Sequence, residues 1–287
     1  MLWSPTPSDV PRSGRPAYRV GLDCYGHDMQ TRGSSAALSL RGLSKAYGPT
    51  LAVDRLDLDV PRGSFFGLVG PNGAGKTTTL SMATGLLRPD AGTAHVLGHD
   101  VWSDTVQAKR LVGILPDGLR LFDRLTGLQL ICYSGLLRGM DRPVVTDRAH
   151  ELIDALGLAE AGGTLVVDYS AGMKKKISLA CALIHAPRLL VLDEPFEAVD
   201  PISASTIRQI LDGYAASGGT VILSSHVMDL VQRLCDRVAI VAAGQIRAVG
   251  TLDEVRSGMT LEERFVQLVG GQTYVGEGLA WLRTSSD

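Results

Sequence analysis

The stretch GPNGAGKTT at residues 70–78 decides the fold of this chain. It fits the pattern G-x-x-x-x-G-K-[ST], and it lies between a short apolar segment, residues 64–69, and a predicted helix from Lys76 to about Leu87. Glycines let backbone N–H groups curl around phosphates without Cβ clashes, and the following helix points its positive dipole end at them. A chance match has a probability on the order of 1% at average residue usage. The stretch therefore predicts a nucleotide-binding site.

The side chains of this loop indicate how the nucleotide is held. Lys76 places a positive charge against the β- and γ-phosphates, and the Thr77 hydroxyl is a hard oxygen ligand of the kind that Mg²⁺ prefers. We therefore expect ATP and Mg²⁺ at this loop. The residues expected to contact the nucleotide in this segment are Gly70, Pro71, Asn72, Gly73, Ala74, Gly75, Lys76, Thr77 and Thr78.

Two carboxylates follow a second apolar segment. Residues 189–192 are LLVL, and Asp193 and Glu194 come directly after them. The carboxyl end of a strand beside the phosphate loop is where such a sheet binds ligands. Asp193 is therefore a candidate Mg²⁺ ligand, directly or through a water, and Glu194 a candidate general base for the attacking water. His226 follows the apolar segment 220–225 and could orient the water or bond the γ-phosphate, although a single histidine there is more often structural.

A second candidate anion site is YSAGM at residues 169–173, which precedes an apolar helical run at 177–184. Ser170 is a natural N-cap, and the helix N-terminus, the small residues and the lysines at 174–176 together favour an anion. Taken alone, the lysine run is typical of a solvated helix face. One nucleotide does not need two such helix termini in one subunit. We therefore expect this segment to serve a nucleotide bound to another subunit.

Composition excludes several function classes. The chain has 287 residues, of which 45% are hydrophobic, and its formal net charge of −2 gives no bulk electrostatic reason to expect a nucleic-acid partner. Its four widely spaced cysteines predict neither a zinc site nor a disulfide framework. No apolar stretch reaches the roughly 18 residues that a membrane-spanning helix needs, and we expect no signal peptide.

The pattern along the chain predicts one large domain between two tails. Residues 1–36 are expected to be a disordered tail, 37–270 the folded domain and 271–287 a C-terminal tail. Apolar spacing of three and four residues predicts a mostly helical region, about 117–186. The predicted helices lie at 125–137, 144–158 and 261–268, and the predicted strands at 51–60, 64–69, 188–192, 220–224 and 238–241.

The motifs, in this order, resemble those of ABC transporter ATPase subunits over about Leu38 to Gly270. GPNGAGKTT is similar to the Walker A motif of that family, and LLVLDEP to its Walker B motif with Glu194 as the catalytic glutamate. YSAGM stands where the family has its LSGGQ signature, and His226 matches the switch histidine. The sequence is similar in style to subunits paired with ABC-2-type permeases, which are commonly exporters.

This resemblance implies an α/β fold: a P-loop NTPase (RecA-like) core with an antiparallel β region and an inserted α-helical subdomain. It implies that Tyr47 stacks on adenine, that Asp200 lies at the contact between two subunits, and that Ser170 and Gly172 reach a γ-phosphate across the dimer. Asp117 stands where the family usually has glutamine, and it joins Thr77 and Asp193 as a candidate Mg²⁺ ligand. Met173 replaces the signature glutamine.

The expected function is that of an ATP-binding and ATP-hydrolysing subunit that couples ATP-driven dimer closure to transport, commonly export, by a separate multi-spanning permease. The expected partners are a second ATPase subunit, identical or not, and that permease, with no nucleic acid. The chain itself is expected to be peripheral, at the cytoplasmic face of the cell membrane. One alternative is an ATP-gated regulatory module with slow turnover, which the departures at Asp117 and Met173 motivate. Another is a soluble relative acting on ribosomes or DNA, against which stand the single ATPase core and the absence of a long coiled-coil pattern.

Overall fold

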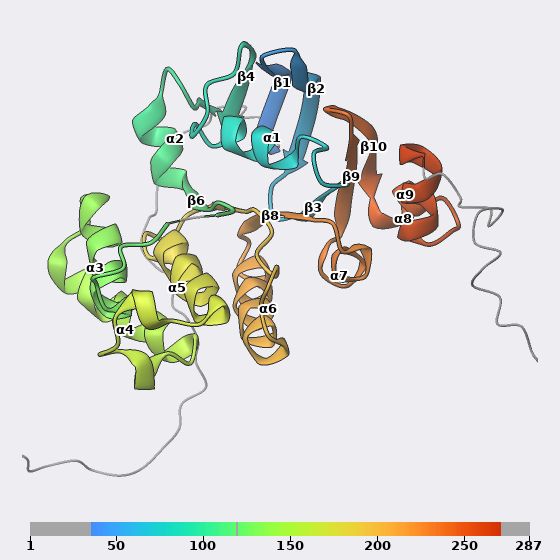
Figure 1. Ribbon diagram of the computed structural model, residues 1–287. Coiled ribbons are helices and arrows are strands. Elements are labelled where there is room, and N and C mark those ends of the chain that lie inside the picture. The colour runs from blue at the N-terminus through green and yellow to red at the C-terminus, as the bar shows by residue number, and fades with distance from the viewer. Residues whose placement is uncertain (1–35, 119, 271–287) are drawn as a thin grey trace, which may run out of the picture. The chain divides into compact units, whose positions relative to one another are not determined.

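The computed structural model describes residues 36–118 and 120–270 (Figure 1). The two predicted tails, 1–36 and 271–287, lie outside the described residues except for Ala36, which is the first residue of a strand. The described part is a mixed α/β fold built on two sheets, as the resemblance implied. In the described segments, no helix combines the length and the apolar character needed to cross a bilayer.

The central sheet has six strands in the order β10-β9-β3-β8-β7-β6, and only the β10–β9 pair is antiparallel. All residues of β3, β7 and β8 are buried, which explains why these strands are almost continuously apolar. Their carboxyl ends meet at one edge, where the phosphate loop and the two carboxylates follow. The strand bounds are β3 Phe65–Val69, β6 Val112–Leu115, β7 Leu189–Leu192, β8 Thr220–Ser225, β9 Arg237–Ala242 and β10 Gln245–Thr251.

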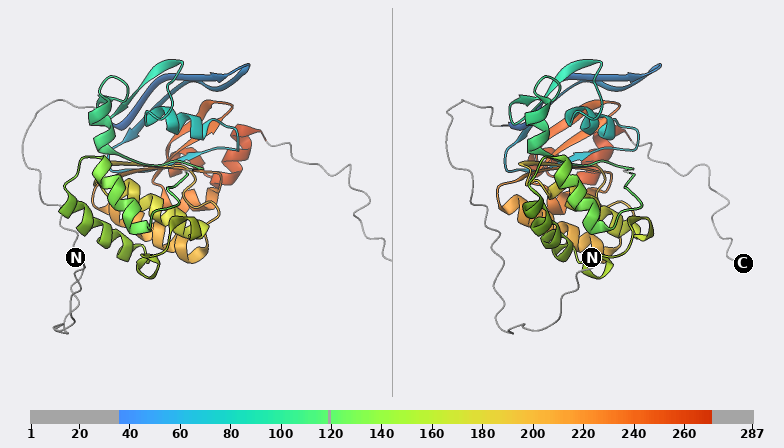
Figure 2. Two further views of the ribbon diagram at one scale, coloured as in Figure 1. Left: turned by 60° about the vertical axis from the view of Figure 1, so that its left-hand side comes forward. Right: turned by 90° about the vertical axis from the view of Figure 1, so that its left-hand side faces the viewer.

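The second sheet is the antiparallel β region, with the strand order β2-β1-β4-β5. Figures 1 and 2 show helix α1, Lys76–Ala83, between this sheet and the central one. The polar and apolar residues of β2 alternate because one of its faces packs inward and the other meets solvent. The bounds are β1 Ala36–Tyr47, β2 Thr50–Pro61, β4 Ala91–Val96, β5 His99–Asp100 and, beside them, helix α2 Thr105–Leu111.

Helix α1 ends earlier than the sequence predicted. The expected end was near Leu87, but α1 stops at Ala83. The Thr84 hydroxyl donates to the carbonyl oxygen of Leu80 at 2.8 Å, and Gly85 has φ +72°. The prediction placed the end near Leu87 because Pro89 follows and a proline cannot continue a helix. A glycine in the left-handed conformation commonly ends a helix, and Gly85 lies upstream of that proline.

Helices fill the region between β6 and β7, on the opposite side of the central sheet from α1 (Figure 1). Helix α3 begins at Gly127 and not at Leu125, because Thr126 forms a capping box with Gln129. Helix α4 begins before Val144 because a proline is accommodated in its first turn, and it ends at Ala155, ahead of the left-handed Gly157. The bounds are α3 Gly127–Leu137, α4 Arg142–Ala155, α5 Ala171–Leu183, and short 3₁₀ helices η1 Ala159–Ala161 and η2 Val166–Asp168.

The remaining helices follow β7, β8 and β10. Helix α9 lies at Leu261–Val269, one residue longer than the predicted amphipathic helix. Its N-terminus has a capping box formed by Thr260 and Glu263. The bounds are α6 Pro201–Ala216, α7 Met228–Leu234, α8 Leu252–Arg256 and α9 Leu261–Val269.

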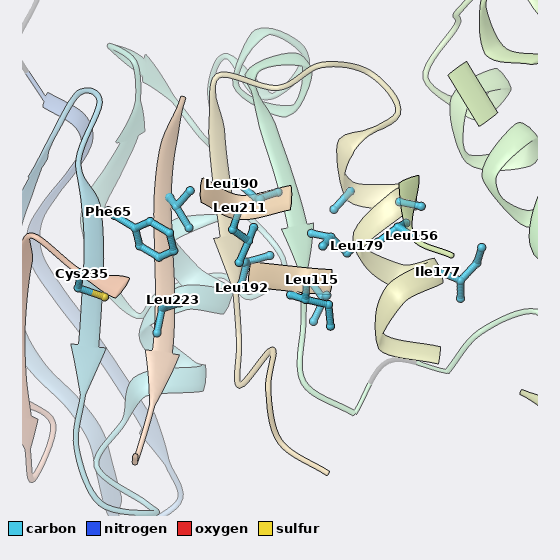
Figure 3. Close-up of a cluster of buried hydrophobic side chains, with 14 of the residues drawn as sticks. Phe65, Leu115, Leu156, Ile177, Leu179, Leu190, Leu192, Leu211, Leu223 and Cys235 are labelled. Carbon is cyan, nitrogen blue, oxygen red and sulfur yellow. The ribbon is translucent and has the colours of Figure 1, made fainter. Parts of the chain in front are cut away.

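The hydrophobic core lies on both faces of the central sheet. Along β3, Phe65 and Val69 pack on the face of α5 and α6, whereas Phe66 and Leu68 pack on the face of α1. The same alternation divides β7, since side chains along a strand point to opposite faces in turn. Figure 3 shows part of the first cluster, in which Leu190 and Leu192 of β7 lie near Leu211 of α6. Two packed faces hold the carboxyl ends of β3 and β7 rigidly in place.

Candidate nucleotide-binding site

The phosphate loop joins β3 to α1 and depends on glycine at two positions. A Cβ at Gly70 would collide with the carbonyl oxygen of Val241 in β9. Gly75 has φ +100°, and a Cβ there would collide with the carbonyl oxygen of Ala52 in β2. Both sheets therefore press against the loop, and only glycine lets the backbone pass between them.

The loop forms one wall of a cavity of about 470 Å³. Most residues that the sequence singled out lie around it, drawn from β1, the loop, α1 and the segments after β6, β7 and β8. The cavity is lined by Tyr47, Ala52, Asn72, Gly73, Ala74, Gly75, Lys76, Thr77, Thr78, Asp117, Glu194, Glu197 and His226. Segments that are far apart in the sequence, from Tyr47 to His226, thus meet at one site, as expected at the carboxyl end of a doubly covered sheet.

Lys76 is buried at the base of the cavity. Its ammonium group donates to the carbonyl oxygens of Gly70 at 2.7 Å and Pro71 at 3.2 Å. The same group lies 3.7 Å from Oε1 of Glu194. Gly70 and Pro71 are not among the cavity-lining residues, so their carbonyls orient Lys76 while the following residues face the open space. A positive charge held at this depth favours a phosphate group above it.

Glu194 is the carboxylate best placed for chemistry. Its side chain is only 12% exposed, and Oε1 lies 3.2 Å from Nδ1 of His226 and 3.7 Å from the Lys76 ammonium. Its backbone has φ +46°, and its N–H donates to the Ser224 hydroxyl at 2.9 Å. A left-handed backbone at a non-glycine residue persists only where surrounding contacts hold it. The strand-to-loop turn therefore directs this carboxylate into the cavity.

Asp193 lies behind Glu194 and does not line the cavity. It is buried, and its carboxylate accepts a hydrogen bond from the Ser224 hydroxyl at 2.5 Å. Ser224 therefore joins the two carboxylate positions, because its hydroxyl donates to Asp193 and accepts from the backbone N–H of Glu194. This bond uses one oxygen of Asp193, and the second oxygen of the carboxylate is still available as an acceptor.

Besides Gly70, Pro71 and Asp193, three more predicted site residues do not line the cavity. Ser170 caps α5 by accepting from the backbone N–H of Met173 at 3.2 Å. At Gly172 a Cβ would approach the Asp200 carboxylate to 2.7 Å, so these two segments pack against each other. Asp200 caps α6, and hydrogen bonds from the backbone and side chain of Ser203 hold the pKa of its carboxyl below the usual range. The structure brings these residues together with one another but not with Lys76.

The lysine run 174–176 is not a free anion-binding face. The Lys174 ammonium donates to the carbonyl oxygen of Val167 at 3.1 Å, the Lys175 ammonium to that of Glu194 at 2.8 Å, and Lys176 is buried. We expected these lysines to strengthen the anion site at the start of α5. The structure differs for Lys174 and Lys175, because both ammonium groups donate to backbone carbonyl oxygens of the same chain.

Sequence reasoning did not assign four residues to this site, and it named Lys175 only within the lysine run 174–176. Ala52 and Glu197 line the cavity, Ser224 joins Asp193 to Glu194, and Lys175 reaches the backbone of Glu194. Glu197 and Ser224 had a usable signal: Glu197 lies three residues after Glu194, and Ser224 is the residue before the last one of β8, the strand adjacent to β7. Ala52 and Lys175 are brought to the site only by tertiary packing.

Comparison with known proteins places this site in context. The protein-family model described as ABC transporter matches residues 53–197. Daunorubicin/doxorubicin resistance ATP-binding protein DrrA of Streptomyces peucetius is 40% identical over 223 residues, which are 78% of this chain and 68% of DrrA. Nod factor export ATP-binding protein I of Cupriavidus metallidurans is 35% identical over 221 residues, 77% of this chain and 73% of that protein.

Solved structures show the same fold. The ATP-binding subunit of an ABC transporter superposes with a TM-score of 0.75 at 28% identity and covers 81% of this chain and 99% of its own. A dimeric ATP-binding cassette bound to ADP and Pi superposes with a TM-score of 0.69 at 23% identity, over 75% of this chain and 98% of its own. At that identity the second likeness supports the fold alone.

Proposed function

Because the chain belongs to the ABC transporter family, as one of its ATP-binding and ATP-hydrolysing subunits, we propose that its ATPase cycle drives export through a separate membrane permease. The observation that carries this proposal is the convergence of the phosphate loop, Glu194 and His226 on one cavity of about 470 Å³. Each group there has a role in transferring a phosphoryl group to water.

In the proposed hydrolysis, a water oxygen attacks the γ-phosphorus of ATP and the bond from that phosphorus to the bridging oxygen of ADP breaks. Glu194 accepts a proton from the water, and the products are ADP and inorganic phosphate.

Lys76 exchanges its bonds to the carbonyls of Gly70 and Pro71 for the β- and γ-phosphate oxygens, which accept more strongly because they are charged. His226, 3.2 Å from Glu194, holds the carboxylate and reaches the γ-phosphate. Tyr47, which is exposed at the cavity rim, stacks on adenine.

The donor set fits Mg²⁺. Thr77 and Asp117 offer a hydroxyl and a carboxylate on the cavity wall, and buried Asp193 retains a second carboxylate oxygen. In the described parts of the chain, no three His, Cys, Asp or Glu side chains are placed to hold a metal ion on their own. Mg²⁺ in nucleotide sites is bound by one or two protein ligands together with substrate phosphates, so a sparse protein set is what this ion requires. When bound, it would neutralise charge on the phosphates.

The proposed cycle uses two subunits. Ser170, Gly172 and Asp200 lie outside the cavity of their own chain, yet the start of α5 presents a capped helix N-terminus of a kind that binds anions. A second subunit, identical or not, placed head to tail would bring its residues 169–173 to the γ-phosphate held by the first. ATP then joins the two subunits, and hydrolysis removes the shared charge and lets them separate.

The membrane partner and the direction of transport rest on similarity to relatives whose names state drug resistance and export. In this proposal the chain is a peripheral subunit on the cytoplasmic face of the membrane. The helical region 117–186 passes dimer closure to the permease, and specificity for the transported molecule resides mainly in that permease.

Steady-state ATPase activity of the chain assembled with its native permease tests this function. A transport motor should release phosphate at roughly 1 s⁻¹ or faster, within the usual range of enzymes, and chelation of Mg²⁺ by EDTA should abolish the release. Turnover slower than about one per minute in the assembled complex would instead favour an ATP-gated regulatory module, since a motor cannot transport faster than it hydrolyses. Phosphate release that persists in EDTA would contradict the role given to Mg²⁺.

A further inference from the structure

Lys175 lies on α5 and contacts two other segments that line the cavity, one after β7 and one after β6. It is the fifth residue of α5, and its side chain is only 19% exposed. Its ammonium group donates to the carbonyl oxygen of Glu194, after β7, at 2.8 Å. The same group lies 3.9 Å from Oδ1 of Asp117, in the segment between β6 and α3. One partly buried positive charge therefore bonds to the backbone of the candidate general base and lies within ion-pair distance of the Asp117 carboxylate, which lines the cavity.

The backbone of Glu194 requires such support. Its φ of +46° is a left-handed conformation that is strained for a non-glycine residue and persists only where surrounding contacts hold it. Two strong contacts hold it: the Ser224 hydroxyl accepts from the N–H at 2.9 Å, and the Lys175 ammonium donates to the C=O at 2.8 Å. A weaker bond from the N–H of Glu197 reaches the same carbonyl at 3.3 Å. Because the backbone groups on both sides of the Cα are held, the side chain leaves the backbone in a defined direction, and His226 and Lys76 then contact its carboxylate.

Asp117 gives Lys175 a charge partner that a neutral amide could not provide. The carboxylate is 45% exposed and lines the cavity, and at 3.9 Å it attracts the ammonium without a hydrogen bond. Since Lys175 is bonded to Glu194 on one side and attracted to Asp117 on the other, a displacement of the segment carrying Asp117 changes the force on the amino group. That change reaches the carbonyl of Glu194 directly.

We propose that Lys175 is a positioning residue for ATP hydrolysis: it fixes the backbone that directs the Glu194 carboxylate and couples that backbone by charge to Asp117. The inference rests on the proposed hydrolysis and deepens it, because it provides a route by which movement of the segment after β6 regulates the general base. Lys175 acts through Glu194 and touches no reacting atom.

The expected effect falls on turnover and not on nucleotide binding. Lys175 is not among the cavity-lining residues, so its loss should leave the phosphate loop and Tyr47 intact. General-base catalysis contributes typically 10²–10⁴-fold, and a carboxylate that has lost its direction retains only part of this. Lys175→Met keeps the apolar stem and removes the ammonium group. We expect it to lower kcat roughly 10- to 100-fold and to change the KM for ATP by less than about threefold.

Two variants separate positioning from simple destabilisation. Lys175→Arg retains a positive donor and should recover kcat to within about threefold of the unchanged chain. Lys45→Met removes the ammonium from a similarly buried pair, since Lys45 is 16% exposed and lies 2.7 Å from a half-exposed Asp90, away from Glu194. The thermal midpoints of Lys175→Met and Lys45→Met should therefore be similar, while Lys45→Met keeps its kcat.

Coupling to Asp117 is tested by a double-mutant cycle at saturating Mg²⁺. If Asp117 acts on turnover through Lys175, Asp117→Asn should lower kcat in the unchanged chain but cause little further loss in Lys175→Met. If the two single-variant losses in kcat multiply fully in the double variant, the coupling between Asp117 and Lys175 is overturned. A Lys175→Met protein with unchanged kcat, or one whose loss lies in KM, would overturn the positioning role. Failure of the proposed function would give a different result. The unchanged chain itself would then release no more phosphate than Glu194→Gln.

Discussion

Replacing Glu194 with glutamine is expected to lower kcat for ATP hydrolysis by roughly 10³-fold, because general-base catalysis contributes about 10²–10⁴-fold and the amide cannot accept the proton from water. The substitution preserves the shape of the side chain, and the bonds from Ser224 and Lys175 to the backbone of Glu194 stay intact. ATP should therefore still bind but persist unhydrolysed. We expect the protein to accumulate as an ATP-bound dimer, detected by light scattering with ATP and Mg²⁺.

A matched control for this prediction is Glu160→Gln. Glu160 is an exposed carboxylate on η1, away from the cavity, and the same chemical change there should leave both kcat and dimer formation unaltered. If Glu194→Gln stays monomeric with ATP and Mg²⁺, the two-subunit cycle is wrong. If it hydrolyses ATP at the rate of the unchanged chain, Glu194 is not the general base.

Removing the ammonium group of Lys76 has the second large expected effect. Lys76→Ala should weaken ATP binding by roughly 10²- to 10⁴-fold, because each hydrogen bond to a charged group contributes about 1.5–3 kcal/mol and Lys76 is placed to make two. Loss of the ammonium group also removes its bond to the Gly70 carbonyl and leaves the Pro71 carbonyl with only the backbone N–H of Ala74, so the loop is held less firmly. Titration with a fluorescent ATP analogue measures the affinity.

The control for Lys76→Ala is Lys109→Ala, which removes an exposed lysine in the last turn of α2 and should leave the affinity for ATP unchanged. Thermal unfolding of both variants distinguishes lost affinity from lost folding. Nucleotide affinity that stays the same in a folded Lys76→Ala protein would defeat the assignment of residues 70–78 as the phosphate-binding loop.

The local parts of this site could be predicted from the sequence. The phosphate loop, the Asp193–Glu194 pair and the N-cap at Ser170 are contiguous motifs whose backbone geometry is set by nearby residues. The fully buried strands were equally predictable because both of their faces are covered: β3 and β7 have no polar side chains, and β8 has the apolar run 221–223 at its centre. Tyr47, Asp117 and Asp200 were assigned by family resemblance.

Other parts depend on contacts between distant segments. The role of Lys175 follows from a bond to Glu194 across 19 residues of sequence, and no local pattern encodes it. The strand pattern places Ser224 near the site, but its bond to Glu194, across 30 residues, depends on how the strands pack. Helix α1 ended at Ala83 because the hydroxyl of Thr84 and the backbone of Gly85 acted before the proline that the prediction relied on. In each case tertiary packing or side-chain capping decided what periodicity could not.

The claim that this ATPase serves a membrane permease is tested most directly by affinity purification of tagged Glu194→Gln, with ATP and Mg²⁺, from solubilised native membranes. Mass spectrometry then identifies the proteins that purify with it. We expect a multi-spanning membrane protein that is absent when Lys76→Ala replaces the trapped variant. Lys76→Ala binds ATP weakly and so cannot form the ATP-bound dimer that keeps the complex with the permease closed. Ribosomal or DNA-bound partners, with no membrane protein, would leave the ATP chemistry standing and contradict the transport function.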